Sequence, residues 1–268
     1  MHRTLFTPAM IETFRTCKRA YELAFVKFSS GSRHSSLTGS CKRFVLKAIA
    51  EVNRGKLTNS QQVQKFMGQG WPLDKVGDDS SEKEMCTRAF LFAFKSLTRY
   101  VGKPYRPTNS EVAAVALKVR ARVAHVRVYV EDTIDLVLWY PNERRLELVN
   151  FQMQPLKPIN PAWPSVSLLV KAYLADRLRV RWQFEKLSIT TYRVGTQEYA
   201  KTTVQVDESL YRLHWAEVVK SLEEMKQPPA KESQCTASSN GLCKHCCAIQ
   251  KSSVYESISG YSPSALSA

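Results

Sequence analysis

The stretch VEDTIDLVLWYPNERRLELVNFQMQPLKP, from Val130 to Pro158, predicts two β-strands joined by a Pro-Asn turn. Asp135 lies inside the first strand, and Asn150 and Gln152 interrupt the apolar run at the end of the second. Because side chains alternate between the two faces of a strand, the two carboxamides share one face. We expect Asp135 to point to that same face, and Glu147 to lie on the opposite face.

The pattern around this hairpin predicts an α/β (α+β) fold with a mixed central sheet flanked by helices. The helical period dominates before the hairpin, and strands alternate with helices after it. We expect a single domain over 1–253, followed by a flexible tail over 254–268. Within the domain, 1–105 would be mainly helical, 106–226 would form the sheet core, and 227–253 would be a cysteine-rich segment.

Two amphipathic helices are expected at the ends of this domain. The first begins at Thr7 and Pro8, an N-cap followed by proline in the first turn. Its apolar stripe would consist of Met10, Phe14, Cys17, Tyr21, Phe25 and Phe28. The second runs through ESLYRLHWAEVVKSLEEMKQ, and its stripe would consist of Leu210, Leu213, Val218, Leu222 and Met225.

The charge balance favours a polyanionic partner. The chain has 268 residues, with 39 Lys and Arg against 24 Asp and Glu, for a net charge of +15. Such an excess creates a positive field that attracts nucleic acid, although a solvated basic surface or an acidic protein partner would also fit. The cations expected to follow a phosphate backbone are Lys118, Arg120 and Arg122 on a strand, and Arg177, Arg179 and Arg181 in DRLRVRW.

The apolar segments of the chain are short. None approaches the length of a membrane span, and charged residues interrupt the N-terminal MHRTLFTPAMIETFRTC. We therefore expect a cytoplasmic protein with no membrane partner.

The cysteines gather near the C-terminus. Four of the seven, Cys235, Cys243, Cys246 and Cys247, fall in CTASSNGLCKHCC. The spacing C-x2-C is common to zinc and iron–sulfur sites. Zinc could use three of these cysteines with a fourth cysteine or His245, and reduced surface thiols are a further alternative.

Four segments, taken in order, resemble the RecB-like branch of the PD-(D/E)xK nuclease superfamily, which includes CRISPR-associated exonucleases with an iron–sulfur cluster. TPAMIETFRTCKRAYEL is similar to the opening helix of that branch, and the Val130–Pro158 hairpin is similar to its core hairpin. SLLVKAY is similar to the helix that follows, with Tyr173 on the family tyrosine and Leu169 on the usual Gln. CTASSNGLCKHCC is similar to the C-terminal ligand segment.

The resemblance implies a degenerate catalytic motif. Asp135 matches the motif acid, while Asn150 and Gln152 fall where the family has a second acid and a Lys. Arg43 stands where the family often has a His. Uncharged carboxamides are poor ligands for hard cations, so Mg²⁺ or Mn²⁺ is expected only if the site is active.

The resemblance also implies a cofactor and partners. A 4Fe–4S cluster would be held by Cys17, Cys235, Cys243 and Cys246, with zinc as the alternative. We expect a DNA-binding or structural subunit. A complex with other nucleic-acid-processing subunits would fit this role. The alternatives are an active metal-dependent DNA nuclease and a zinc-stapled adaptor that binds an acidic protein.

Overall fold

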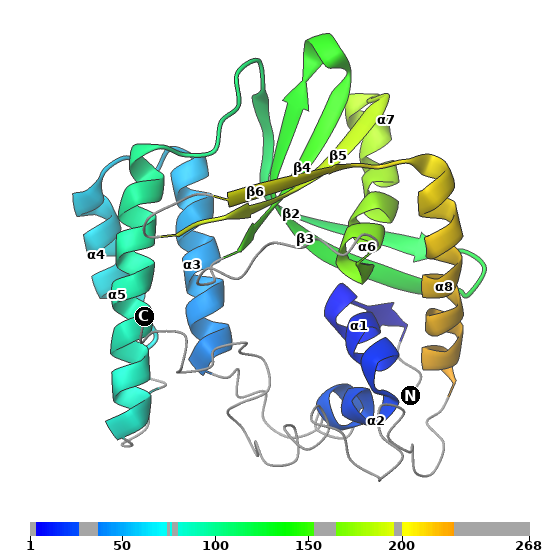
Figure 1. The fold of residues 1–268 in the computed structure, drawn as a ribbon, viewed down its shortest axis with the longest axis horizontal. Coiled ribbons are helices and arrows are strands. Elements are labelled where there is room, and N and C mark those ends of the chain that lie inside the picture. Colours follow the sequence, from blue (N-terminus) through cyan, green and yellow to red (C-terminus); the bar gives the residue numbers. More distant parts are fainter. Residues whose placement is uncertain are drawn as a thin grey trace.

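The computed structural model describes residues 4–26, 37–73, 76, 80–152, 165–195 and 200–227. These residues form a six-stranded mixed sheet with helices on both faces (Figure 1). The predicted fold class, a mixed central sheet flanked by helices, is thereby confirmed. Within the described ranges, no helix has both the length and the apolar character needed to cross a bilayer.

The sheet has the order β1-β3-β4-β5-β6, and β2 pairs with the other edge of β3. The strands are β1 (Leu5–Phe6), β2 (Glu111–Val123), β3 (Val128–Tyr140), β4 (Arg145–Gln152), β5 (Lys186–Arg193) and β6 (Ala200–Gln205). Neighbouring strands are antiparallel except for β1 with β3 and β4 with β5. The parallel β4–β5 pair needs a crossover connection, and a helical segment supplies it.

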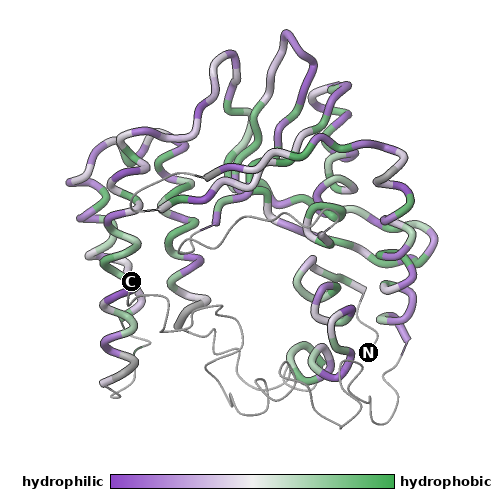
Figure 2. Tube along the Cα trace, viewed as in Figure 1, coloured by the Kyte–Doolittle hydropathy of each residue, from purple (hydrophilic) through white to green (hydrophobic). Residues whose placement is uncertain are grey.

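Two groups of helices cover the two faces of the sheet (Figure 1). One group consists of α1 (Pro8–Thr16), α6 (Val166–Ala175) and α8 (Glu208–Lys226), and the other of α3 (Leu37–Asn53), α4 (Ser60–Gly70) and α5 (Ser80–Gly102). Each group packs on its own buried apolar cluster. In Figure 2 the helices carry both apolar and hydrophilic bands, as expected for helices with one buried side.

The remaining helical segments are short. They are α2 (Lys18–Tyr21), the π-helix η1 (Glu22–Val26), and η4 (Pro141–Glu143), η5 (Asp176–Leu178) and α7 (Arg179–Trp182). The segment η4 forms the turn between β3 and β4, where a Pro-Asn turn is expected. Arg144 closes that turn in the left-handed region, with φ 47°.

The single first helix expected from Thr7 onward is wrong, because the helix breaks at Cys17. Cys17 is extended, with φ −159° and ψ 111°, and its Sγ accepts the N–H of Ala20 at 3.4 Å. It therefore ends α1 and caps α2. The expected stripe survives in part, since Met10, Cys17 and Tyr21 are buried.

The stripe expected for the last helix is wrong at Leu213, whose exposed fraction is 67%. Val218, Leu222 and Met225 are buried as expected. In the preceding turns, however, the helix turns aromatic side chains toward the sheet, and Tyr211 and Trp215 pack against the core. The large area of the two rings outweighs the alternative of burying one leucine.

Candidate functional site

The β3 strand changes its packing at Asp135. Ile134 and Val137 are three residues apart, yet both belong to the apolar cluster beneath α6, so the simple alternation is interrupted between them. On β2, Ala116 has a left-handed φ of 52° where the ladder would oppose Asp135. The β2–β3 ladder is therefore irregular at the position of Asp135.

Asp135 closes the β3–β4 ladder with its side chain. The paired register ends at Leu136 and Val149, and beyond it the N–H of Phe151 donates to Oδ2 of Asp135 at 2.8 Å. The carboxylate thus takes an N–H at the point where the two strands stop pairing.

The structure places Asp135, Asn150 and Gln152 on one face of the hairpin. Asn150 and Gln152 alternate with Val149 and Phe151 of the α3–α5 cluster, so both carboxamides project to the other face, and the charge of Lys171 on α6 acts on Asp135 from that side. This is the face covered by α6, because Leu148 on β4 belongs to the same cluster as the α6 side chains. All three side chains are half-buried.

Glu147 lies on the opposite face, as the alternation of β4 predicts. It is 2% exposed and shares that face with Val149 and Phe151, which pack against the α3–α5 group. It therefore cannot join Asp135 as a second acid.

A buried ion pair adjoins Asp135 and was not foreseen in the sequence. Lys171 on α6 is 3% exposed, and its ammonium group donates to Oδ2 of Asp132 and to Oγ of Ser167. The available signal was a single lysine inside VSLLVKAYLA, an otherwise apolar helix. A buried lysine is rarely tolerated without a partner, so the sequence did indicate an acid nearby.

Burial raises the pKa of Asp135 to about 6. The N–H of Phe151 and the positive charges of Lys171 and Lys42 oppose this rise, and the negative charge of Asp132 adds to it. A raised pKa means that the charged form is less stable here than in water. Such a group is a candidate for function, since it lowers stability at neutral pH.

The side chains around Asp135 do not fit a Mg²⁺ or Mn²⁺ centre. A hard cation prefers several carboxylate oxygens, but here Asp132 is already bound by Lys171, and Asn150 and Gln152 bring only amides. Among the described residues, no cluster of three or more His, Cys, Asp or Glu side chains could hold a metal ion. We therefore derive no metal-dependent step.

Tyr173 is directed away from this cluster. Lys171 and Tyr173 are two positions apart on α6, so they project from different sides of the helix. The Tyr173 hydroxyl donates to the carbonyl oxygen of Arg122 at 2.7 Å, and its ring stacks on Trp215 with centroids 4.3 Å apart. The structure thus places Tyr173 beside the β2–β3 pair, here called the basic hairpin because β2 carries Lys118, Arg120 and Arg122.

The predicted basic residues fall into two exposed sets. On β2, Lys118, Arg120 and Arg122 are exposed and alternate with the buried Val119 and Ala121. Lys118 pairs with Glu131 at 2.9 Å, and Arg120 lies over the ring of Tyr129 at 4.1 Å.

The second set lies after α6 on helical segments. Arg177 is exposed, and its positive charge opposes the rise in the pKa of Tyr173 that burial causes. Because the Tyr173 hydroxyl also donates to the carbonyl oxygen of Arg122, Tyr173 lies between the two basic sets. Arg179 pairs with Asp176 at 3.1 Å, while Arg181 lies over the ring of Trp182 at 4.7 Å.

The proposed cluster ligands can be placed only for Cys17, which is fully buried. Cys235, Cys243 and Cys246 lie outside the described residues, as do all of 228–253 and the tail. The 4Fe–4S cluster and its zinc alternative stay predictions. Cys41 and Cys86 are buried core thiols, and burial raises the pKa of Cys41 to about 12.

Comparison with known proteins gives similarities in three dimensions only. No protein-family model matches the chain, and no curated protein matches its sequence. The crystal structure of a candidate exonuclease from Eubacterium rectale aligns over 99% of this chain and 93% of its own, with 10% identity and a TM-score of 0.47. The protein SSO0001 aligns over 70% of this chain and 88% of its own, with 9% identity and a TM-score of 0.27. Both scores are too low to assign a shared fold.

Proposed function

We propose that this chain is a RecB-like PD-(D/E)xK protein with a degenerate motif, which binds DNA without cutting it. The observation that carries the proposal is the shared face of Asp135, Asn150 and Gln152, beneath the helix that follows the hairpin. These are the elements and positions on which the sequence resembles the nuclease motif.

Asp135 supports an inherited site. A core needs no half-buried acid with a pKa near 6, because an amide or an apolar residue there would avoid the cost of desolvating a charge. Asn150 and Gln152 have side chains close in size to the acid and amine they would replace, but they carry no charge. The site would therefore keep its shape while losing its chemistry.

The basic hairpin supports DNA as the partner. Lys118, Arg120 and Arg122 project from the exposed face of β2, an edge strand that pairs with β3 alone among the described strands. At the far end of this row, Arg122 adjoins Tyr173 and the charge of Arg177. A row of cations along an extended strand matches the repeating charge of a phosphate backbone.

An active nuclease is the second candidate, and one observation favours it. Lys171 and Asp132 lie beside Asp135, so a lysine and a further carboxylate are present although the motif positions lack them. If nucleic acid or metal displaced the Lys171–Asp132 pair, both groups would become available to a phosphodiester.

A single gel experiment separates these functions. End-labelled single- and double-stranded DNA is titrated with anaerobically purified full chain, with Mn²⁺ or with a chelator. We expect slower-migrating complexes without shortened products in both conditions. Shortened products that need Mn²⁺ and disappear in Asp135→Ala and Lys171→Met would establish the active nuclease instead. If neither complexes nor shortened products form, the result favours the adaptor that binds an acidic protein.

The hairpin is tested by charge removal with a matched control. Replacing Lys118, Arg120 and Arg122 by Gln should weaken DNA binding about 10- to 100-fold and lower the slope of log K against log[salt] by about 2 to 3. The control replaces Lys65, Arg88 and Lys95 on α4 and α5, which removes the same net charge from exposed positions elsewhere. Equal losses in the two triple variants would show that the hairpin has no special role.

A further inference from the structure

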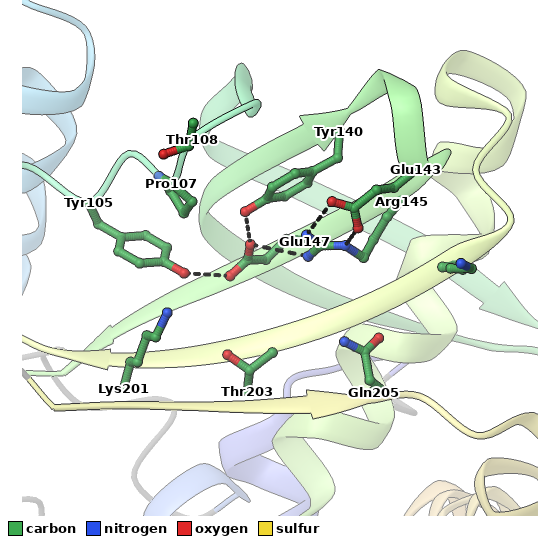
Figure 3. A pocket seen from close by; sticks show the side chains of 11 residues that line it. Tyr105, Pro107, Thr108, Tyr140, Glu143, Arg145, Glu147, Lys201, Thr203 and Gln205 are labelled. Atoms are coloured by element: carbon green, nitrogen blue, oxygen red, sulfur yellow. Dashed lines mark hydrogen bonds and ion pairs between the residues drawn. The ribbon is translucent and has the colours of Figure 1, made fainter.

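A polar pocket opens on the face of the sheet that carries Glu147, and Figure 3 shows the side chains that line it. Its volume is about 670 Å³, which lies within the range of small-molecule sites. Side chains from β4, β5 and β6 line it, with Tyr140 at the end of β3, Glu143 in the turn after it, and Tyr105, Pro107 and Thr108 from the segment before β2. Elsewhere this face of the sheet is apolar, so the polar lining is a local departure.

The floor of the pocket is built around Glu147. Its Oε1 accepts the Tyr105 hydroxyl at 2.8 Å and the Thr190 hydroxyl at 2.5 Å, and its Oε2 accepts the Tyr140 hydroxyl at 2.5 Å. Arg145 adds a charge contact at 3.6 Å. With four partners, the carboxylate is satisfied without a ligand, and it fixes the positions of the groups around it.

The two tyrosines remain protonated donors. Burial raises the pKa of Tyr105 and of Tyr140, and the negative charge of Glu147 raises both further. Their hydroxyl protons are therefore directed to Glu147, and the rings form rigid walls.

Arg145 is also held in place. Its guanidinium pairs with Glu143 at 2.7 Å, donates to Oγ of Ser188 at 3.2 Å and lies 3.6 Å from the centre of the Tyr140 ring. Arg145 thus pairs with Glu143 inside the pocket, and its further contacts hold the guanidinium in this position.

Two lysines lie at the rim, and the charge of one of them, Lys186, acts on Glu143. Lys186 on β5 and Lys201 on β6 are exposed lining residues, and neither forms an ion pair within the described part of the chain. Lys201 lies over the ring of Tyr105 at 5.8 Å. Thr203 and Gln205 follow Lys201 at every second position of β6, so their hydroxyl and amide groups face the same space.

We propose that this pocket binds a phosphate monoester of nucleotide size. Three cations, Arg145, Lys186 and Lys201, line the pocket with two carboxylates, so its net charge is positive by one, and the two ammonium groups are the cations at its exposed rim. Lys186 and Lys201 would hold the phosphate, which lysine binds as a point charge. Thr203, Gln205 and the tyrosine walls would contact the remainder of the ligand. The site is separate from the DNA-binding hairpin and does not depend on the proposed function.

Calorimetric titration of the full chain tests the proposal, with adenosine monophosphate, adenosine and inorganic phosphate as probes. We expect the monophosphate to bind, inorganic phosphate to bind more weakly, and adenosine to bind at least tenfold more weakly than the monophosphate. Equal affinity for adenosine and its monophosphate, or no binding of any probe, would overturn the proposal.

The lysines are tested with a double variant, Lys186→Gln with Lys201→Gln. Both are exposed, so folding should be kept, and we expect a loss of at least tenfold in affinity for the monophosphate. The matched control is Lys56→Gln with Lys220→Gln, which removes two exposed cations elsewhere. Losses of equal size in the two double variants would mean that only net charge matters, and would overturn the site.

A final comparison identifies the source of the phosphate and keeps the two proposals distinguishable. The same titration is run with a 5′-phosphorylated and a 5′-hydroxyl oligonucleotide. A preference for the phosphorylated oligonucleotide that is lost in Lys186→Gln with Lys201→Gln assigns the pocket to a nucleic-acid end. Binding of the monophosphate without such a preference assigns it to a free nucleotide. If the triple variant of Lys118, Arg120 and Arg122 binds DNA as well as the native chain, the DNA proposal fails. The binding of the monophosphate to the pocket would not be affected by that result.

Discussion

The half-buried Asp135 and the buried Glu147 are acids on opposite faces of the same sheet, and their surroundings differ. Glu147 accepts from three side-chain hydroxyls and adjoins Arg145. Asp135 has a backbone N–H as its hydrogen-bond donor and cations that act on it through charge, and its pKa is raised. The number of donors aimed at a buried carboxylate decides whether it stabilises the fold or costs stability.

The largest effect is expected on removing the well-satisfied acid. Glu147→Leu leaves two tyrosine hydroxyls, a threonine and Arg145 without their shared acceptor, so the free energy of unfolding should fall by about 3–5 kcal/mol. Glu147→Gln keeps an acceptor of the same shape and should cost less. Urea unfolding at pH 7 measures both, and a loss below about 1 kcal/mol in Glu147→Leu would contradict the comparison.

The opposite sign is expected at Asp135. Its pKa is raised from 3.8 to about 6, so the folded state binds more protons than the unfolded state between these values. Stability therefore falls as the pH rises from 4 to 6 and then stays lower. Asp135→Asn still accepts the Phe151 N–H and avoids the buried charge, so it should be more stable than the native chain by about 1–3 kcal/mol at pH 7.

The pH profile is the control for that gain. Unfolding of Asp135→Asn and of the native chain is compared from pH 3.5 to 7.5, and the two stabilities should converge at the acidic end. A gain that is independent of pH would assign the effect to packing and leave the charge of Asp135 without a role.

The smallest effect is expected on removing one of the donors to Glu147. Thr190→Val deletes a hydrogen bond to the carboxylate and the contact with the Thr203 hydroxyl at 2.9 Å. The free energy of unfolding should fall by about 1 kcal/mol, because Glu147 keeps its other donors. Thr191→Val, on the other face of the same strand, should change it by less than about 0.5 kcal/mol. Equal effects in both would show that the donor count is not the deciding quantity.

The sequence by itself determined the properties that depend on local period. Alternation along β4 set Asn150 and Gln152 on one face and Glu147 on the other, and alternation along β2 exposed its three cations. Turn and strand signals gave the hairpin and the order of the elements. These features follow from the geometry of one or two adjacent elements, so nearby residues suffice to specify them.

The tertiary structure decided which of these faces meet. It broke the first helix at Cys17, turned Trp215 inward in place of Leu213, and set Lys171 beside Asp132. It also gathered side chains of four strands and of a distant loop around the pocket at Glu147. Each outcome depends on contacts between residues far apart in the chain. Where two side chains compete for one buried position, the side chain whose removal from water is more favourable occupies it. Periodicity within one element carries no information about that competition.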